Sequence, residues 1–140
     1  MRNTILLLSS LAILLILDGC KYPEGPILSL NSATTRISRS WEVVEALDKD
    51  SVDVSESFEN TFTFTESQDV FANIEILQID TDFEGTWDLD NDDTEFELEL
   101  RDNFTGLIRY DKSYDILRLT QEEFWIMDQS DSTTIRLEAN

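Results

Sequence analysis

From residue 58 onward, apolar and polar side chains alternate along the chain in run after run. Successive side chains of a β-strand point to opposite faces, so this period is typical of strands with one buried face. Turn sequences rich in Asp, Asn and Ser separate the runs, at residues 80–82, 91–93, 102–103, 111–113 and 128–131. The longer runs have the apolar faces Phe58, Phe62 and Phe64 (with Asn60); Val70, Ala72, Ile74 and Ile76; Phe83, Gly85, Trp87 and Leu89; and Phe96, Leu98 and Leu100.

Shorter runs of the same kind follow around residues 107–110, 116–119, 124–127 and 135–137. The segment Ser40–Leu47 fits either a helix or a strand interrupted by Glu45, and we favour a strand because Val43 and Val44 are both β-branched. The chain is therefore predicted to be all-β: a single antiparallel meander of about eight strands. Such a meander either closes into a small barrel or folds into two packed sheets.

The N-terminus has the features of an export signal. An apolar run from Ile5 to Leu17, interrupted only by Ser9 and Ser10, would rise about 20 Å as a helix at ~1.5 Å per residue. A hydrocarbon core is about 30 Å thick, so the run is too short to span it and is typical of a secretory signal peptide. It ends in Leu17-Asp18-Gly19-Cys20, which resembles the lipobox of bacterial lipoproteins.

The lipobox resemblance implies cleavage before Cys20, diacylglycerol on its sulfur and a further acyl chain, such as palmitate, on the new amine. Several acyl chains, at about 0.8 kcal/mol per buried methylene, would anchor the protein to a membrane. The alternative is an ordinary signal peptide followed by a chance cysteine. The predicted organisation is a signal peptide over 1–19, a lipidated tether over 20–34 and a β domain over 35–140. By analogy with enteric lipoproteins, Lys21 in place of Asp favours the outer membrane, on either its periplasmic or its surface face.

Charge and composition exclude several functions. The chain has 10 Lys and Arg against 30 Asp and Glu, a net charge of -20, so a nucleic-acid backbone would be repelled. It has no His and one Cys, which excludes imidazole catalysis, cysteine-based zinc sites and internal disulfides. Glu95, Glu97 and Glu99 share the expected solvent face and are interpreted as solvated carboxylates. We expect neither enzymatic activity nor a cofactor.

A family resemblance rests on the order of several short motifs. They are Trp41, Phe62-x-Phe64, Gly85-Thr86-Trp87-x-Leu89, Phe96-x-Leu98, Ile116-x-x-Leu119-Thr120 and Phe124-x-Ile126. This layout resembles the lipocalin-like domains of Bacteroidetes lipoproteins over about residues 36–139.

The resemblance implies a small barrel that binds a small apolar ligand among inward aromatic side chains. The candidate ligand-binding residues are Phe62, Phe64, Trp87, Phe96 and Phe124. The alternative is that these residues form the core of a filled barrel, which would act as a protein-interaction or accessory subunit of an envelope complex. A third hypothesis is an acidic lipoprotein that binds cations.

The third hypothesis rests on Asp88, Asp90 and Asp92, which with Glu99 mimic part of an EF-hand calcium loop. Asp93 stands where that loop needs glycine, and the flanking residues alternate as strands do. We therefore interpret the segment as the tip of an acidic hairpin and treat a calcium site there as the less favoured alternative.

Two further features leave alternatives open. Phe124 and Ile126 interleave with Trp125 and Met127, so one of the two pairs faces outward. An outward Trp125–Met127 pair would form a partner-binding or membrane-facing patch, or would be covered by the tether or a loop.

Residues 50–52 and 131–133 resemble the short O-glycosylation motif of Bacteroidetes and lie in expected turns.

Overall fold

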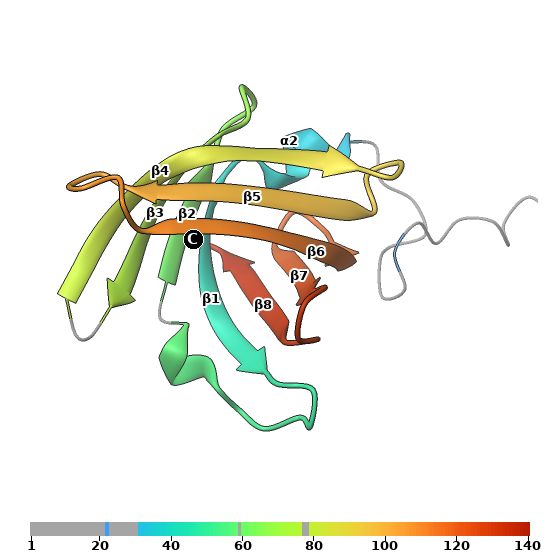
Figure 1. The fold of residues 1–140 in the computed structure, drawn as a ribbon. Coiled ribbons are helices and arrows are strands. Elements are labelled where there is room, and N and C mark those ends of the chain that lie inside the picture. Colours follow the sequence, from blue (N-terminus) through green and yellow to red (C-terminus); the bar gives the residue numbers. More distant parts are fainter. Residues whose placement is uncertain (1–21, 23–30, 59, 77–78) are drawn as a thin grey trace, which may run out of the picture.

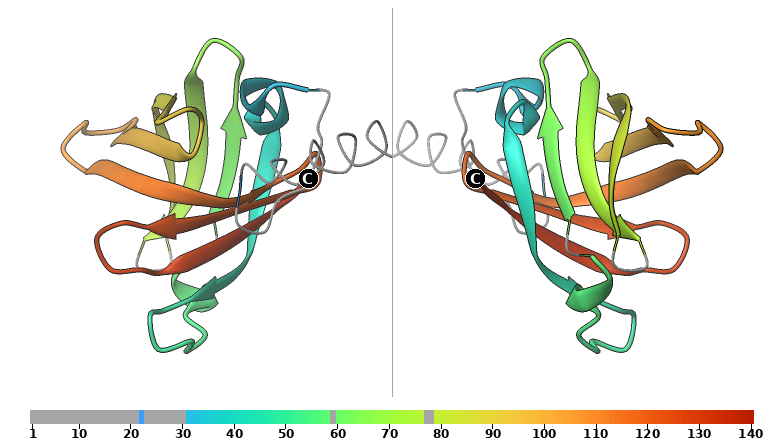
Figure 2. Two further views of the ribbon diagram at one scale, coloured as in Figure 1. Left: turned by 90° about the vertical axis from the view of Figure 1, so that its right-hand side faces the viewer. Right: turned by 90° about the vertical axis from the view of Figure 1, so that its left-hand side faces the viewer.

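Eight strands pair in chain order and close into a barrel (Figure 1). The computed structural model describes Tyr22 and residues 31–58, 60–76 and 79–140. Each strand is antiparallel to the next, and β1 pairs with β8 to complete the ring, which Figure 2 shows from two sides. The strands are β1 (Ser40–Leu47), β2 (Asn60–Phe64), β3 (Asp69–Ile76), β4 (Ile79–Asp90), β5 (Glu95–Asp102), β6 (Arg109–Leu119), β7 (Glu123–Asp128) and β8 (Thr134–Ala139).

Closure of the ring gives every strand of the barrel a hydrogen-bonded neighbour on both sides, which reduces the edges available for edge-to-edge aggregation. The prediction of an all-β antiparallel meander is confirmed, and so is the small barrel that the lipocalin-like resemblance implied. All strand pairing lies within residues 40–139, and the buried apolar cluster is drawn from Tyr22 and residues 33–137. Residues 20–140 thus contain a complete closed barrel with its core.

Strand β1 confirms the strand interpretation of Ser40–Leu47 and explains its irregular pattern. Its pairing with β8 shifts register between Val43 and Glu45, which is the signature of a β-bulge. The extra residue reverses the alternation, so Trp41 and Ala46 are both fully buried although their positions differ by five, which would place them on opposite faces of a regular strand. Val44 at the bulge points to solvent.

A short helix, α2 (Ala33–Ile37), covers one end of the barrel. The side chain of Ser32 caps it by accepting a hydrogen bond from the Thr35 amide at 3.1 Å. Ile37 is fully buried, and its carbonyl accepts a hydrogen bond from the Trp41 indole at 2.8 Å. The expected start of the β domain at residue 35 falls inside this helix.

The end covered by α2 also receives Tyr22, the one described residue of the expected tether before residue 31. Tyr22 is only 2% exposed, and the Arg36 guanidinium lies over its ring, 5.8 Å from the centroid. The expected signal peptide, Cys20 and residues 23–30 lie outside the described residues. Within the described part of the chain, no helix is long and apolar enough to cross a membrane.

Aromatic side chains fill the barrel toward the α2 end. Phe96 contacts Phe64 and Phe124 edge-on, with ring centroids 5.5 and 5.2 Å apart. Phe124 in turn lies 5.6 Å from Trp41, below the helix. Edge-to-face contacts of this kind add to the hydrophobic energy of burial. They make this half of the interior a packed core.

Candidate functional site

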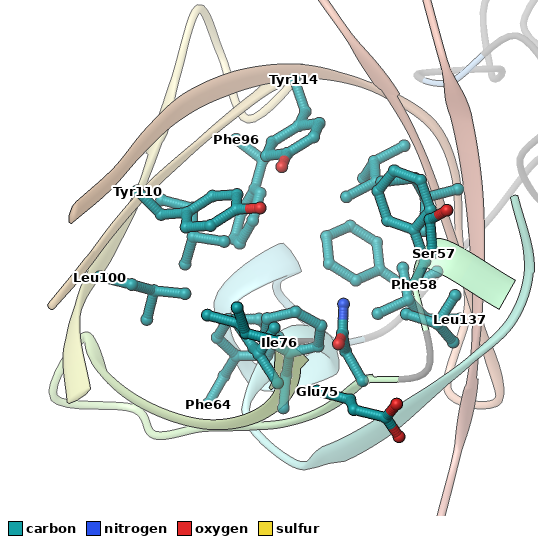
Figure 3. Close-up of a pocket in the computed structure, with 18 residues that line it drawn as sticks. Ser57, Phe58, Phe64, Glu75, Ile76, Phe96, Leu100, Tyr110, Tyr114 and Leu137 are labelled. Carbon is teal, nitrogen blue, oxygen red and sulfur yellow. The ribbon is translucent and has the colours of Figure 1, made fainter. Parts of the chain in front are cut away.

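The other half of the barrel interior contains a cavity of about 290 Å³ (Figure 3). Every strand except β4 contributes side chains to its wall, together with the last residue of the short 3₁₀ helix η1 (Ser55–Ser57) and the residue that follows it. The lining residues are mainly aliphatic and aromatic: Val43, Ser57, Phe58, Asn60, Phe62, Phe64, Ile74, Glu75, Ile76, Phe96, Leu98, Leu100, Tyr110, Tyr114, Phe124, Ile126, Ile135 and Leu137.

The cavity extends from the aromatic core to a mouth at the end away from α2. Ser57, Phe58, Ile76 and Tyr110 surround this mouth and are partly or largely exposed. Glu75 also lies at the mouth, with its carboxylate directed away from the cavity in Figure 3. No lysine or arginine is among the described residues that line the cavity. The interior therefore offers an apolar surface without a positive charge.

Two polar side chains are buried in this apolar wall. Tyr114 is 6% exposed and Asn60 is 9% exposed. Neither side chain makes a hydrogen bond to another residue in the part of the chain that the structure describes. The hydroxyl of Tyr114 points into the cavity in Figure 3, as does that of Tyr110 at the mouth. Burial raises the pKa of Tyr114 well above its usual range, so its hydroxyl stays protonated as a hydrogen-bond donor.

The structure places four of the five predicted ligand-binding residues on the cavity wall. These are Phe62, Phe64, Phe96 and Phe124. Trp87 is the exception: its ring lies 5.8 Å from that of Phe64, away from the cavity, and its indole nitrogen donates to the Thr65 carbonyl at 3.2 Å. Trp87 supports the wall from the core side.

Sequence reasoning missed the polar residues of the cavity, although the signal was present. Asn60 stands at an inward position of its strand, between Phe58 and Phe62. Tyr114 precedes the inward Ile116 by two residues and therefore shares its face. A polar residue at an inward position of an alternating strand indicates a candidate binding site, because burying a polar group without a hydrogen-bond partner is unfavourable.

The acidic hairpin lies outside the barrel, at the turn between β4 and β5. Asp88 and Asp90 point outward, opposite glutamates of β5, and Asp92 lies in the turn with a φ of 57°. Asp88 accepts a hydrogen bond from the Gln68 side chain, and Asp90 accepts one from the Asn91 amide at 2.7 Å. In the described residues, no group of three or more His, Cys, Asp or Glu side chains is placed to hold a metal ion.

The outward pair on β7 is Trp125 and Met127, and both are half-buried. The Trp125 ring lies between two guanidinium groups, with Arg118 at 5.3 Å and Arg136 at 4.4 Å from its centroid. Both arginines also form ion pairs with neighbouring glutamates. Cation–π contacts therefore cover the indole, and neither the tether nor an apolar patch is needed to account for it.

Comparison with known proteins supports the fold. No protein-family model and no curated protein matches the sequence. Among solved structures, a lipocalin-like protein from Bacteroides uniformis ATCC 8492 is similar at a TM-score of 0.55 and 10% identity, covering 75% of this chain and 99% of that one. A redesigned β barrel is similar at a TM-score of 0.52 and 12% identity, covering 81% and 99%. At these identities the likeness shows the fold alone, and the fold is a lipocalin-like barrel.

Proposed function

We propose that this protein is a non-enzymatic lipoprotein of the bacterial cell envelope whose barrel binds a small apolar ligand. The observation that carries the proposal is the cavity of about 290 Å³ enclosed by apolar side chains. Small-molecule sites are typically concave, mostly apolar and equipped with a few polar groups, with volumes from about 300 Å³ upward. The cavity of this barrel is at the small end of that range.

The cavity also supports this proposal over the filled-barrel alternative. An eight-strand barrel has an interior just wide enough to be filled by side chains or to hold one small ligand. Here the aromatic cluster around Phe96 fills the half toward α2, and the half toward the mouth is left open. A barrel without a ligand would gain stability by filling that space, since voids forfeit contacts.

One observation favours the second candidate function, that of an interaction subunit in an envelope complex. Phe104 and Leu107, in the loop between β5 and β6, are 94% and 83% exposed, and Ile79 at the start of β4 is also exposed. Phe104 and Ile79 line the same shallow surface hollow. Clustered exposed apolar side chains are typical of a surface that meets a partner.

Binding of a defined apolar probe tests the principal proposal. We expect residues 20–140 carrying Cys20→Ser, which prevents acylation, to bind 1-decanol with one-to-one stoichiometry in isothermal titration calorimetry. Leu100→Trp should weaken this binding at least tenfold, because Leu100 lines the cavity and the larger side chain would project into the space that the ligand occupies. Leu107→Trp, the same substitution in the exposed loop, is the control and should bind as the parent does. Equal binding by both variants would contradict a site inside the barrel.

The proposed anchor is an acylated Cys20, supported by the lipobox resemblance of residues 17–20. Tyr22 follows two residues later, a span of at most about 7 Å in an extended chain. Because Tyr22 packs beside Arg36 at the α2 end, this spacing supports an arrangement in which the closed end faces the bilayer. The mouth of the cavity would then open away from the membrane.

Fractionation of bacteria that produce the full chain tests the anchor. The parent protein should be found in the membrane fraction, and its mass should exceed that of residues 20–140 by the attached acyl groups. Cys20→Ser should release it to the soluble fraction or leave it unprocessed, whereas the neighbouring substitution Lys21→Ala should keep it acylated and membrane-bound. Recovery of the parent protein with an unmodified Cys20 would contradict the proposal.

A further inference from the structure

We infer that the ligand is a small neutral amphiphile, with on the order of twelve non-hydrogen atoms, that hydrogen-bonds to Asn60 and Tyr114. This inference rests on the proposed ligand-binding function and specifies the chemical class that the same cavity accepts. Three properties of the cavity carry it: its volume, its two buried polar side chains and the absence of basic groups from its described lining.

Volume limits the size of the ligand. A cavity of about 150 Å³ lined by apolar side chains holds one benzene molecule, which has six carbon atoms. By the same proportion, the 290 Å³ of this cavity holds on the order of twelve non-hydrogen atoms. A medium-length aliphatic chain or a two-ring compound is of this size, whereas a long-chain lipid would have to extend through the mouth.

The two polar side chains define what the ligand carries. Asn60 is on β2 and Tyr114 is on β6, four strands apart in a ring of eight, so they reach into the cavity from opposite walls. Both polar groups line the cavity, and neither makes a hydrogen bond to another described residue, so a molecule in the cavity can bond to them. The Tyr114 hydroxyl donates, and the Asn60 amide can donate or accept. A ligand with a hydroxyl, carbonyl or amide group would satisfy them.

The electrostatic environment selects against an anionic head group. A carboxylate moved from water into an apolar cavity needs a cation or several donors to remain charged. No lysine or arginine lines this cavity in the described part of the chain, Glu75 stands at its mouth, and the whole chain carries a net charge of -20. A fatty-acid anion therefore meets repulsion at the mouth and no counter-charge inside, while a neutral amphiphile of the same length meets neither obstacle.

The test compares 1-decanol with decanoate, which have chains of equal length and differ in charge. At pH 7 the residue 20–140 protein carrying Cys20→Ser should bind 1-decanol at least tenfold more tightly than decanoate. In the same protein, the double substitution Asn60→Leu with Tyr114→Phe should weaken binding of 1-decanol at least tenfold. Tyr22→Phe removes the same hydroxyl at the α2 end and serves as the matched control, with unchanged binding.

The outcomes separate this inference from the function on which it rests. Decanoate binding as tight as that of 1-decanol would overturn the inference, as would unchanged binding of 1-decanol by the double variant; either result leaves a ligand-binding barrel intact. Binding of neither compound would overturn both. If the double variant fails to fold, as judged by near-UV circular dichroism, the comparison of the two compounds on the parent protein still decides the inference.

Discussion

At Gly85, in the middle of β4, the barrel wall leaves no room for a side chain. A Cβ atom at this position would lie 1.8 Å from the carbonyl oxygen of Glu99 on the neighbouring strand β5. Glycine within a strand is otherwise unfavourable, because it has no side chain to pack and loses more conformational entropy on folding. Its presence here is explained by the close approach of the two backbones.

We predict that Gly85→Ala lowers the free energy of unfolding by about 2 kcal/mol or more, because the backbones of β4 and β5 must separate. Urea unfolding followed by tryptophan fluorescence measures the change. Gly106→Ala is the comparison: Gly106 has a φ of 65° but no atom near its Cβ position, so only backbone strain of about 1 kcal/mol is expected. A smaller effect at residue 85 than at residue 106 would contradict the close approach.

Individual residues also show the limit of periodicity as a predictor. Alternation assigned the inward face correctly for Phe62, Phe64, Phe96 and Phe124, and these four line the cavity. It could not separate them from Trp87, which shares the inward orientation but lies in the packed core. A two-residue period in the sequence indicates which face of the sheet a side chain occupies. The position of that side chain along the barrel axis depends instead on strand register and strand tilt.

Among the elements, the connection between β5 and β6 is organised by one buried carboxylate. Asp102 accepts hydrogen bonds from the amides of Thr105 at 2.5 Å and Ile108 at 2.8 Å, and from the Thr105 hydroxyl. The backbone hydrogen bond from Thr105 is the main reason that the pKa of Asp102 is held well below its usual range. These bonds fix the turn that leads to the exposed loop between β5 and β6.

The lowered pKa of Asp102 predicts that the free energy of unfolding falls as the pH is lowered. Because Asp102 binds its proton more weakly in the folded state, its contribution to stability is complete above its unfolded pKa of about 3.9 and is lost as pH falls through its lower folded pKa. Asp102→Asn should therefore be less stable than the parent at pH 5.5, and the difference should shrink steadily below pH 4. Urea unfolding of both proteins across this range measures it, and the difference between them isolates Asp102 from the other acidic groups. A difference independent of pH would contradict this account.

Strand β1 shows why one element was ambiguous from sequence. The bulge between Val43 and Glu45 inserts a residue, so the buried Trp41 and Ala46 do not follow a two-residue period. In the sequence, Trp41, Val44 and Leu47 also fitted one face of a helix. Bulges depend on pairing with a distant strand, here β8, and such pairing leaves no local pattern in the sequence.

At the scale of the whole molecule, alternation predicted the antiparallel meander, whereas the barrel was predicted only through the resemblance to lipocalin-like domains. An eight-strand meander alternates in the same way whether it closes or folds into two sheets, and closure depends on pairing of β1 with β8 across almost the whole domain. The cavity exists because the inward side chains do not fill the whole interior of the barrel, and their packing cannot be predicted from alternation. Aromatic rings pack against one another around Phe96 toward α2, whereas the aliphatic and aromatic side chains of the other half leave a space between them.

Native mass spectrometry tests the central claim, that the barrel encloses a small-molecule site, most directly. The Cys20→Ser protein over residues 20–140 would be produced in a Gram-negative bacterium and purified without detergent, then measured before and after incubation with a total lipid extract. The account predicts a one-to-one adduct on the order of 200 Da, the mass of about a dozen non-hydrogen atoms with their hydrogens, and its loss in Leu100→Trp. A bare mass under both conditions would contradict a ligand-binding barrel and favour the protein-interaction alternative.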